Sequence, residues 1–231
     1  DFNYGAPNYG FPMTGSHTIG MWLHLPLDAT AYTDHCFVTS TTNGHYMYAD
    51  ANNVIGYYDS GGGGGFRSSG FDLDTLSGWH YVALTSDHSA TETKIYVDGV
   101  QVGSTIGSVK TNGVAMNQVG ASSQSFGKLG GLAIWNTVLT ASELLSIFND
   151  TNPNSVQTNN LLLLWTLQET SGTTAINSAT GTASLGTGSA PSGDGVLGSG
   201  YSIGQTGVNF PVTKPTNVQD NSILVEKDTA K

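Results

Sequence analysis

Two alternating segments joined by a polar turn constrain the fold of this chain more than any other feature. Residues 79–85 and 94–97 are two alternating runs rich in aromatic and branched apolar side chains, which is typical of β-strands. The second segment runs into Asp98 and Gly99, a dipeptide that favours a tight turn when apolar alternations flank it. The sequence therefore predicts antiparallel strands joined by short turns.

Residues 18–25 form the cleanest alternation in the chain, and Pro26 ends it. Because successive side chains of a strand point to opposite faces, this segment predicts one fully apolar face and one mixed face. The apolar face holds Ile19, Met21, Leu23 and Leu25, and the other face holds Trp22 and His24.

Further short strands are expected at residues 36–41, 45–49, 54–58, 115–119, 131–134 and 160–167, and turn residues separate them in the manner of all-β folds. A single helix is expected at residues 141–148, where Thr140 can cap the first turn and Glu143 can complete a capping box. No apolar run approaches the ~18–20 residues that a membrane helix needs.

The order of these motifs carries a family resemblance. A tryptophan strand, a Tyr-Val-Asp-Gly hairpin ending at Gly99, the segment 130–136 with Trp135, and a Leu-Thr-Ala-Ser-Glu-Leu helix follow one another. This order resembles the laminin-G-like family of concanavalin-A-type jelly rolls over residues 13–150. The resemblance implies an all-β fold, a two-sheet antiparallel jelly-roll sandwich with one short helix and extended terminal arms. It also implies a binding or structural module and not an enzyme.

Three segments are expected along the chain. Residues 1–15 form an aromatic, glycine- and proline-rich arm, residues 16–180 form the sandwich, with 160–180 as its edge strands, and residues 181–231 form a Gly/Ser-rich extension. Residues 220–231 resemble a segment near the ends of phage and virus structural proteins. The chain begins at Asp1 and stops at Lys231, and we expect a processed or trimmed product.

Composition narrows the class of partner. The chain of 231 residues carries a formal charge of −10 with only seven Lys and Arg, which argues against binding to phosphate backbones or to anionic membranes. Charged residues are 10% of the chain and there are 31 glycines, unlike a typical cytoplasmic enzyme. Cys36 is the single cysteine, so no intrachain disulfide can form. We expect an extracellular protein, virion-borne or secreted.

Residues suited to catalysis are sparse. Glycanases need two carboxylates facing one sugar linkage, and the four glutamates, Glu92, Glu143, Glu169 and Glu226, place no pair on one predicted strand. The six histidines show no ligand-spaced pair of the kind zinc needs. The sequence therefore predicts no enzyme activity.

Calcium is the cofactor that the acidic composition favours. Calcium binds carboxylate and carbonyl oxygens on loops, and the candidate ligands bracket the strand at 54–58: Asp50, Asn52, Asn53 and Asp59. The alternative is that these residues only stabilise turns.

A carbohydrate-binding surface is predicted on consecutive strands. Exposed aromatic rings beside polar side chains suit sugar binding, and the candidates are Asn43, His45, Tyr46, Tyr48, Tyr57 and Tyr58. The same tyrosines could instead be core edges or subunit contacts.

The ends of the chain predict self-association. Apolar side chains rarely stay in water along two tails, and the candidate assembly residues are Phe2, Tyr4, Tyr9, Phe11, Tyr201 and Phe210. The alternative is that both arms fold back on their own sandwich. Two functions follow: a structural subunit of a virion or other extracellular assembly, such as a capsid-decorating, fibre or tail protein, and a secreted lectin-like adhesion module.

Overall fold

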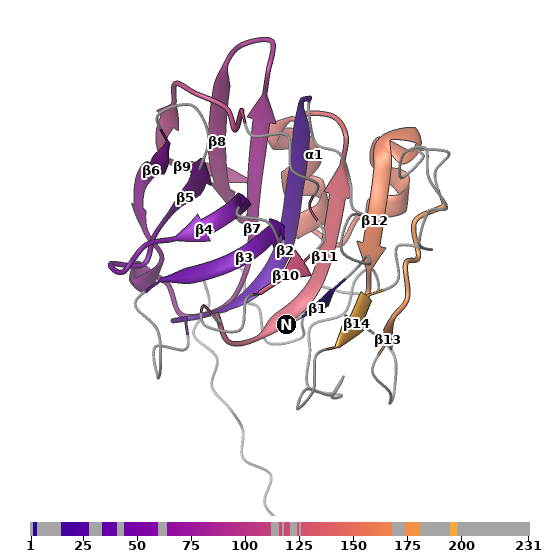
Figure 1. Cartoon of the computed structure of the whole chain (residues 1–231). Helices are drawn as coiled ribbons and strands as arrows, with labels where there is room; N and C mark the ends of the chain where they lie inside the picture. The colour runs from indigo at the N-terminus through magenta and orange to yellow at the C-terminus, as the bar shows by residue number, and fades with distance from the viewer. Residues whose placement is uncertain are drawn as a thin grey trace, which may run out of the picture.

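Two antiparallel β-sheets pack face to face in the computed structural model of the chain (Figure 1). The structure describes residues 2–3, 15–27, 34–40, 44–59, 64–111, 116, 118–120, 124, 126–167, 174–180 and 195–197. One α-helix, α1 (Ala141–Phe148), lies within these ranges. The two-sheet sandwich with a short helix confirms the fold class expected from the sequence.

The six-stranded sheet contains the segments with the clearest alternation. Its strand order is β12-β11-β2-β7-β8-β9. Between β8 and β9 the chain turns at Asp98 and Gly99, whose φ values are 52° and 81°, the left-handed pair that a tight hairpin turn requires. The bounds are β2 (His17–Leu25), β7 (Gly78–Asp87), β8 (Glu92–Val97), β9 (Val100–Ile106), β11 (Leu129–Trp135) and β12 (Leu161–Trp165).

The eight-stranded sheet combines hairpins with strands from both ends of the chain. Its order is β13-β14-β1-β10-β3-β4-β5-β6, with a short 3₁₀ helix, η1 (Leu73–Thr75), after β6. The bounds are β1 (Phe2–Asn3), β3 (His35–Ser40), β4 (Gly44–Ala49), β5 (Val54–Asp59), β6 (Gly65–Asp72), β10 (Gln118–Val119), β13 (Thr174–Ala175) and β14 (Gly195–Leu197). The sheet therefore reaches into both segments that were expected to be arms.

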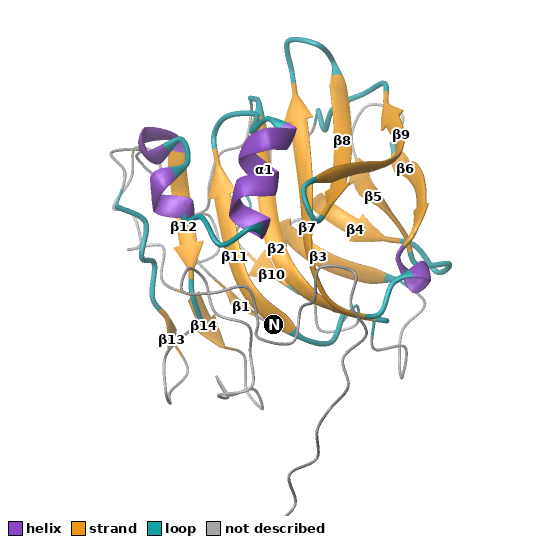
Figure 2. Ribbon diagram, turned by 180° about the vertical axis from the view of Figure 1, so that it is seen from behind, coloured by secondary structure: helices purple, strands orange, loops and turns teal. Residues whose placement is uncertain are grey.

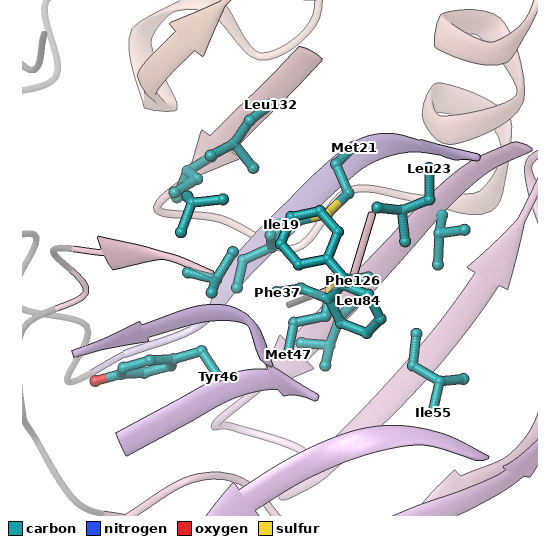
Figure 3. Packing of buried hydrophobic residues seen from close by; sticks show 14 of the residues in the cluster. Ile19, Met21, Leu23, Phe37, Tyr46, Met47, Ile55, Leu84, Phe126 and Leu132 are labelled. Atoms are coloured by element: carbon teal, nitrogen blue, oxygen red, sulfur yellow. The ribbon is translucent and has the colours of Figure 1, made fainter. Parts of the chain in front are cut away.

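The main core lies between the two sheets (Figure 3). The alternating face of β2 enters it with Ile19, Met21, Leu23 and Leu25, all fully buried. Phe37, Met47 and Ile55 meet them from the eight-stranded sheet. The period-2 pattern of the sequence thus accounts directly for the inner face of β2.

A second core lies under α1, on the outer face of the six-stranded sheet (Figure 2). Trp22 of β2 packs on Phe148 of α1 with ring centroids 5.9 Å apart. Nearby, the Trp135 indole donates to the carbonyl of Val156 at 2.9 Å. Thr140 and Glu143 form the capping box expected at the start of α1.

The chain leaves α1 through two short 3₁₀ helices, η2 (Pro153–Ser155) and η3 (Thr158–Asn160), before it enters β12. None of the helices in the described ranges is long and apolar enough to cross a membrane.

Candidate functional site

A β-bulge in β4 decides which aromatic side chains leave the core. His45 pairs with Tyr58 of β5 and Tyr48 pairs with Gly56, and the register shifts between these pairs. The extra residue lets the consecutive residues Tyr46 and Met47 both join the core. As a result His45 and Tyr48, three residues apart, both lie on the opposite face of the sheet.

Four rings gather on this outer face of β4, β5 and β6, and we call them the aromatic face: His45, Tyr48, Tyr58 and Phe66. His45 stacks on Tyr48 with centroids 5.2 Å apart and an interplanar angle of 15°. Tyr58 lies 5.7 Å from His45 and 6.0 Å from Tyr48, and Phe66 lies 5.5 Å from Tyr48. Tyr48 is buried within the cluster, whereas the other three are half-buried and present ring surface to solvent.

A carboxylate borders the aromatic face. The Tyr48 hydroxyl donates to Asp34 Oδ2, and the Gln124 amide donates to the same oxygen at 2.9 Å. Burial, this hydrogen bond and the negative charge of Asp34 raise the pKa of Tyr48. Tyr48 therefore stays a protonated donor that holds Asp34 beside the rings.

The hydrogen bonds of His45 indicate which ring nitrogen carries the proton. Nδ1 lies 3.0 Å from Thr39 Oγ1 and 3.1 Å from Cys36 Sγ. Because Thr39 donates its own proton to the carbonyl of Gly44 at 2.8 Å, we assign Thr39 as the acceptor for His45 and place the ring proton on Nδ1. Burial, and then the positive charge of Lys110, lower the pKa of His45 against the opposing charge of Asp34. Near pH 7 the ring is neutral and Nε2 is an acceptor.

Three of the predicted carbohydrate residues come together here, and two do not. Tyr46 and Tyr57 belong to the main core with 1% and 2% of their surface exposed, so their assignment to a binding surface was wrong. Figure 3 shows the Tyr46 ring at the margin of the core with its hydroxyl pointing away from the neighbouring apolar side chains. The Tyr57 hydroxyl contacts Ser108 Oγ at 2.7 Å. Asn43 lies outside the described residues.

Phe66, Asp34 and Gln124 were missed by sequence reasoning. Phe66 enters the face through its pairing with Tyr58, a register that β6 alone does not reveal. Asp34 lies two residues before Cys36, so strand alternation could have placed it on the same face. Gln124 comes from a distant segment whose carbonyl accepts from the Cys36 N–H at 3.1 Å, and no local signal indicates it.

The predicted calcium ligands do not share one loop. Asp50, Asn52 and Asn53 form the β4–β5 turn, where Asp50 Oδ1 accepts from the N–H groups of Asn52 at 2.9 Å and Val54 at 3.0 Å. Asn53 Nδ2 donates to Asp74 Oδ2 at 2.8 Å. These bonds are those of an Asx turn, the alternative considered above.

Asp59 lies at the other end of β5, and its inclusion among the calcium ligands was wrong. It is 3.8 Å from Lys110 Nζ, and both side chains are nearly fully buried. Asp59 Oδ2 also accepts from the Thr111 N–H at 3.1 Å and hydroxyl at 2.8 Å. Within the described ranges no three His, Cys, Asp or Glu side chains converge in a way that could hold a metal ion.

The histidines on β2 and β7 do not form a zinc site either. His24 packs edge-on against Trp79 with centroids 5.2 Å apart, whereas His80 Nδ1 lies 2.8 Å from Asp98 Oδ2. Burial alone would lower the pKa of His80, but the hydrogen bond and charge of Asp98 outweigh it and raise the pKa. His80 is thus an ion-pair partner that braces the β8–β9 turn.

Of the predicted assembly residues, Phe2 lies inside the fold. It pairs with Val119 of β10 on one side and with Leu197 of β14 on the other. The backbone hydrogen bonds of β1 are therefore made within the chain. Tyr4, Tyr9, Phe11, Tyr201 and Phe210 lie outside the described residues.

Comparison with solved structures shows the same fold in distant proteins. A protein of Bacteroides ovatus, described as a "putative carbohydrate binding protein", superposes with a TM-score of 0.55 at 14% identity, over 93% of this chain and 58% of that one. The chain thus spans little more than half the length of that protein. No curated protein matches the sequence.

Weaker likenesses extend to two other proteins. The SAP-like pentraxin of Limulus polyphemus gives a TM-score of 0.43 at 15% identity, over 61% of this chain and 73% of that one. The CBM40 domain of the Ruminococcus gnavus IT-sialidase, bound to α2,3-sialyllactose, gives 0.40 at 14% identity, over 59% of this chain and 84% of that one.

The sequence itself matches a family model. The model describes the concanavalin A-like lectin/glucanases superfamily, as Laminin_G_3, and its match covers residues 4–145. This is more than half of the chain, and it includes β2, the hairpin of β8 and β9, and all four rings of the aromatic face. The chain belongs to the concanavalin A-like lectin/glucanases superfamily.

Proposed function

We propose that this protein binds glycans through the aromatic face and does not cleave them. The observation that carries the proposal is the cluster of half-buried rings, His45, Tyr58 and Phe66, beside the carboxylate of Asp34. Aromatic rings cover the C–H faces of sugars, while neighbouring polar atoms bind the hydroxyl groups.

Polar atoms at this face are left open for a ligand. No described residue hydrogen-bonds His45 Nε2, Asp34 Oδ1 or the Tyr58 hydroxyl. The other polar atoms of the first two side chains are hydrogen-bonded, His45 Nδ1 to Thr39 and Asp34 Oδ2 to Gln124. Fixed side chains with one free polar atom each lose little conformational entropy when a ligand binds.

The carboxylates near the face act as acceptors. Asp34 Oδ2 accepts two hydrogen bonds, and Asp50 Oδ1 accepts two backbone N–H groups. A glycanase needs one carboxyl that gives up a proton and a second that acts as base or nucleophile. Of the described glutamates, Glu92 pairs with Lys94 and Glu143 caps α1, so neither borders this face.

Carbohydrate binding is in keeping with the superfamily and with the description of the Bacteroides ovatus protein. The low content of charged residues and the scarcity of basic ones support an extracellular location. The aromatic ends and the resemblance of residues 220–231 further support a structural role in a virion or similar assembly. In that role the aromatic face would attach the particle to surface glycans.

Glycan-array binding followed by calorimetry tests the proposal. The Y58A variant should lose about tenfold or more in affinity for the best glycan, since stacking on one ring is worth ~1–3 kcal/mol. The matched Y57F variant changes a neighbouring tyrosine on the core side and should bind like the wild type. Absence of binding to every arrayed glycan, or equal loss in both variants, would overturn the proposal. Hydrolysis of a bound glycan would overturn its non-enzymatic part.

A further inference from the structure

We infer that the aromatic face selects neutral glycans and discriminates against sugars that carry a carboxylate, such as sialic and uronic acids. This inference rests on the proposed function, because it assigns the ligand class of the same surface. Its basis is the sign of the charges around the rings and the hydrogen-bonding character of the open atoms.

The fixed charges that act on Tyr48 are negative, whereas His45 also feels the positive charge of Lys110, which is paired with Asp59. Asp34 is held against Tyr48 by its hydrogen bond. The charges of both Asp34 and Asp50 act on Tyr48 and contribute to its raised pKa, after burial. A sugar carboxylate placed over Tyr48 would therefore meet two like charges, which disfavour its binding.

No described cation is available to compensate. Lys94 lies on β8 of the other sheet, paired with Glu92, and Lys128 directly precedes β11 in that same sheet. Arg67 pairs with Tyr57 and directly follows Phe66 in β6. Because successive side chains of a strand point to opposite faces, Arg67 lies on the face of β6 opposite to the aromatic face.

Lys110 is near the face but turned away from it. Its Nζ donates to the backbone carbonyl of Tyr58 at 3.0 Å and lies 5.2 Å from the Tyr46 ring centroid on the core side. With 3% of its side chain exposed and Asp59 as its ion-pair partner, Lys110 cannot reach a ligand. The remaining basic residues, Lys214, Lys227 and Lys231, lie outside the described residues.

The open atoms match hydroxyl donors. Asp34 Oδ1 accepts only, and His45 Nε2 accepts because Nδ1 carries the ring proton. Sugar hydroxyls can donate to both atoms, whereas a carboxylate has no proton to donate. Among the open atoms of the described residues only the Tyr58 hydroxyl can donate to a sugar carboxylate, so the arrangement complements a polyol better than an acidic sugar.

Paired oligosaccharides provide the experiment. Affinities of the full chain are measured for N-acetyllactosamine and its α2,3-sialylated form, and for matched neutral and uronic-acid oligosaccharides from an array. We expect each acidic partner to bind at least about tenfold more weakly than its neutral counterpart. The D34N variant should reduce the ratio of neutral to acidic affinity. Asn keeps an acceptor for Tyr48 and Gln124, but the substitution removes the charge.

The control is E92Q, which removes one negative charge from the opposite sheet and should leave the ratio unchanged. Acidic glycans that bind as tightly as neutral ones, with binding still lost in Y58A, would overturn the inference and leave the proposed function standing. A ratio that E92Q narrows as much as D34N would also overturn it, since net charge and not Asp34 would be the cause. If no neutral or acidic glycan binds, the proposed function itself fails.

Discussion

At the scale of single residues, burial controls the chemistry of the histidines. His17 is almost fully buried, and its Nδ1 lies 2.9 Å from the carbonyl oxygen of Gly15. Burial lowers its pKa to about 4, against the raising effect of the Gly15 carbonyl and with a further lowering by His88. Its unfolded value is near 6.5, so the unfolded chain takes up the proton first as the pH falls.

This shift predicts a pH dependence of stability. The contribution of neutral His17 to the free energy of unfolding is fully present above pH 6.5. It is lost as the pH falls toward 4, by about 3 kcal/mol in total. His24, His45 and His88, whose pKa values are also lowered by burial, add to the same slope. The H17N variant keeps an N–H donor for Gly15 and cannot titrate, so the slope of its unfolding free energy between pH 7.5 and 4.5 should be smaller.

Urea denaturation at several pH values measures this difference. At pH 7.5 His17 is neutral in both states, so the comparison there isolates the steric cost of the substitution. Identical slopes for the wild type and H17N would show that His17 does not contribute in the predicted way.

Calcium binding stays a prediction, now confined to the β4–β5 turn. Bound calcium should raise the melting temperature by ligand linkage. The D50N variant keeps the acceptor for the N–H groups of Asn52 and Val54 but loses the charge, so its calcium-dependent shift should be smaller. Melting curves of the wild type that coincide in calcium and in chelator would exclude the site.

At the scale of elements, the turn between β8 and β9 joins the six-stranded sheet to its helix. Gly99 has φ +81°, and a Cβ added there would meet Leu145 Cα of α1 at 2.4 Å. We expect G99A to lower the free energy of unfolding by about 1–3 kcal/mol, because the substitution adds both backbone strain and a clash with helix backbone.

Thermal or urea unfolding measures the effect of G99A, and G107A is the matched control. Gly107 follows β9 with no left-handed φ, and a Cβ added there would meet no atom of the described residues within 4 Å. An effect of G99A no larger than that of G107A would contradict the close contact between turn and helix.

Local sequence patterns predict some helices and strands of this protein and miss others. The helix 141–148 and its capping box follow from residues within one turn of each other, and the structure has both. In contrast, β6 was not anticipated, because Gly65–Asp72 lacks an apolar alternation, and β9 was anticipated only as the segment that follows the Asp98–Gly99 turn. Each lies at the edge of its sheet, and their approach is so close that a Cβ at Gly103 would meet the Ser69 carbonyl oxygen at 2.4 Å.

At the scale of the whole molecule, the ends of the chain are partly built into the sandwich. β1 lies between β10 and β14, so strands from positions 2–3 and 195–197 depend on each other. Removing residues 1–12 would take a strand out of this sheet, and a change in mass could then reflect lost folding and not lost assembly.

Self-association through the remaining aromatic residues stays a prediction that substitutions test better than deletion. We expect the native protein to form an assembly, and the combined change of Tyr4, Tyr9 and Phe11 to Ser should lower its mass, since burial of each ring stabilises a contact by ~1.5–3 kcal/mol. Phe2 is kept so that β1 is intact. Light scattering at equal concentration gives the readout, and an unchanged mass with an unchanged melting temperature would contradict a role for the N-terminal segment.

Elements whose signals are local can be predicted from the sequence alone. The alternation of Ile19, Met21, Leu23 and Leu25 sets the inner face of β2, and Asp98 with Gly99 sets the β8–β9 turn. Side-chain period and turn conformation depend on a few neighbouring residues, so they can be read from a short window.

The face of the sheet on which each tyrosine lies depends on contacts between distant strands. The bulge in β4 places Tyr46 in the core and Tyr48 outside it, and the register of β5 with β6 brings Phe66 to Tyr58. The pairing of Asp59 with Lys110 likewise joins residues 51 positions apart, which no local pattern predicts. Register, bulges and buried ion pairs depend on contacts between distant strands, and a one-residue shift sends a side chain to the opposite face.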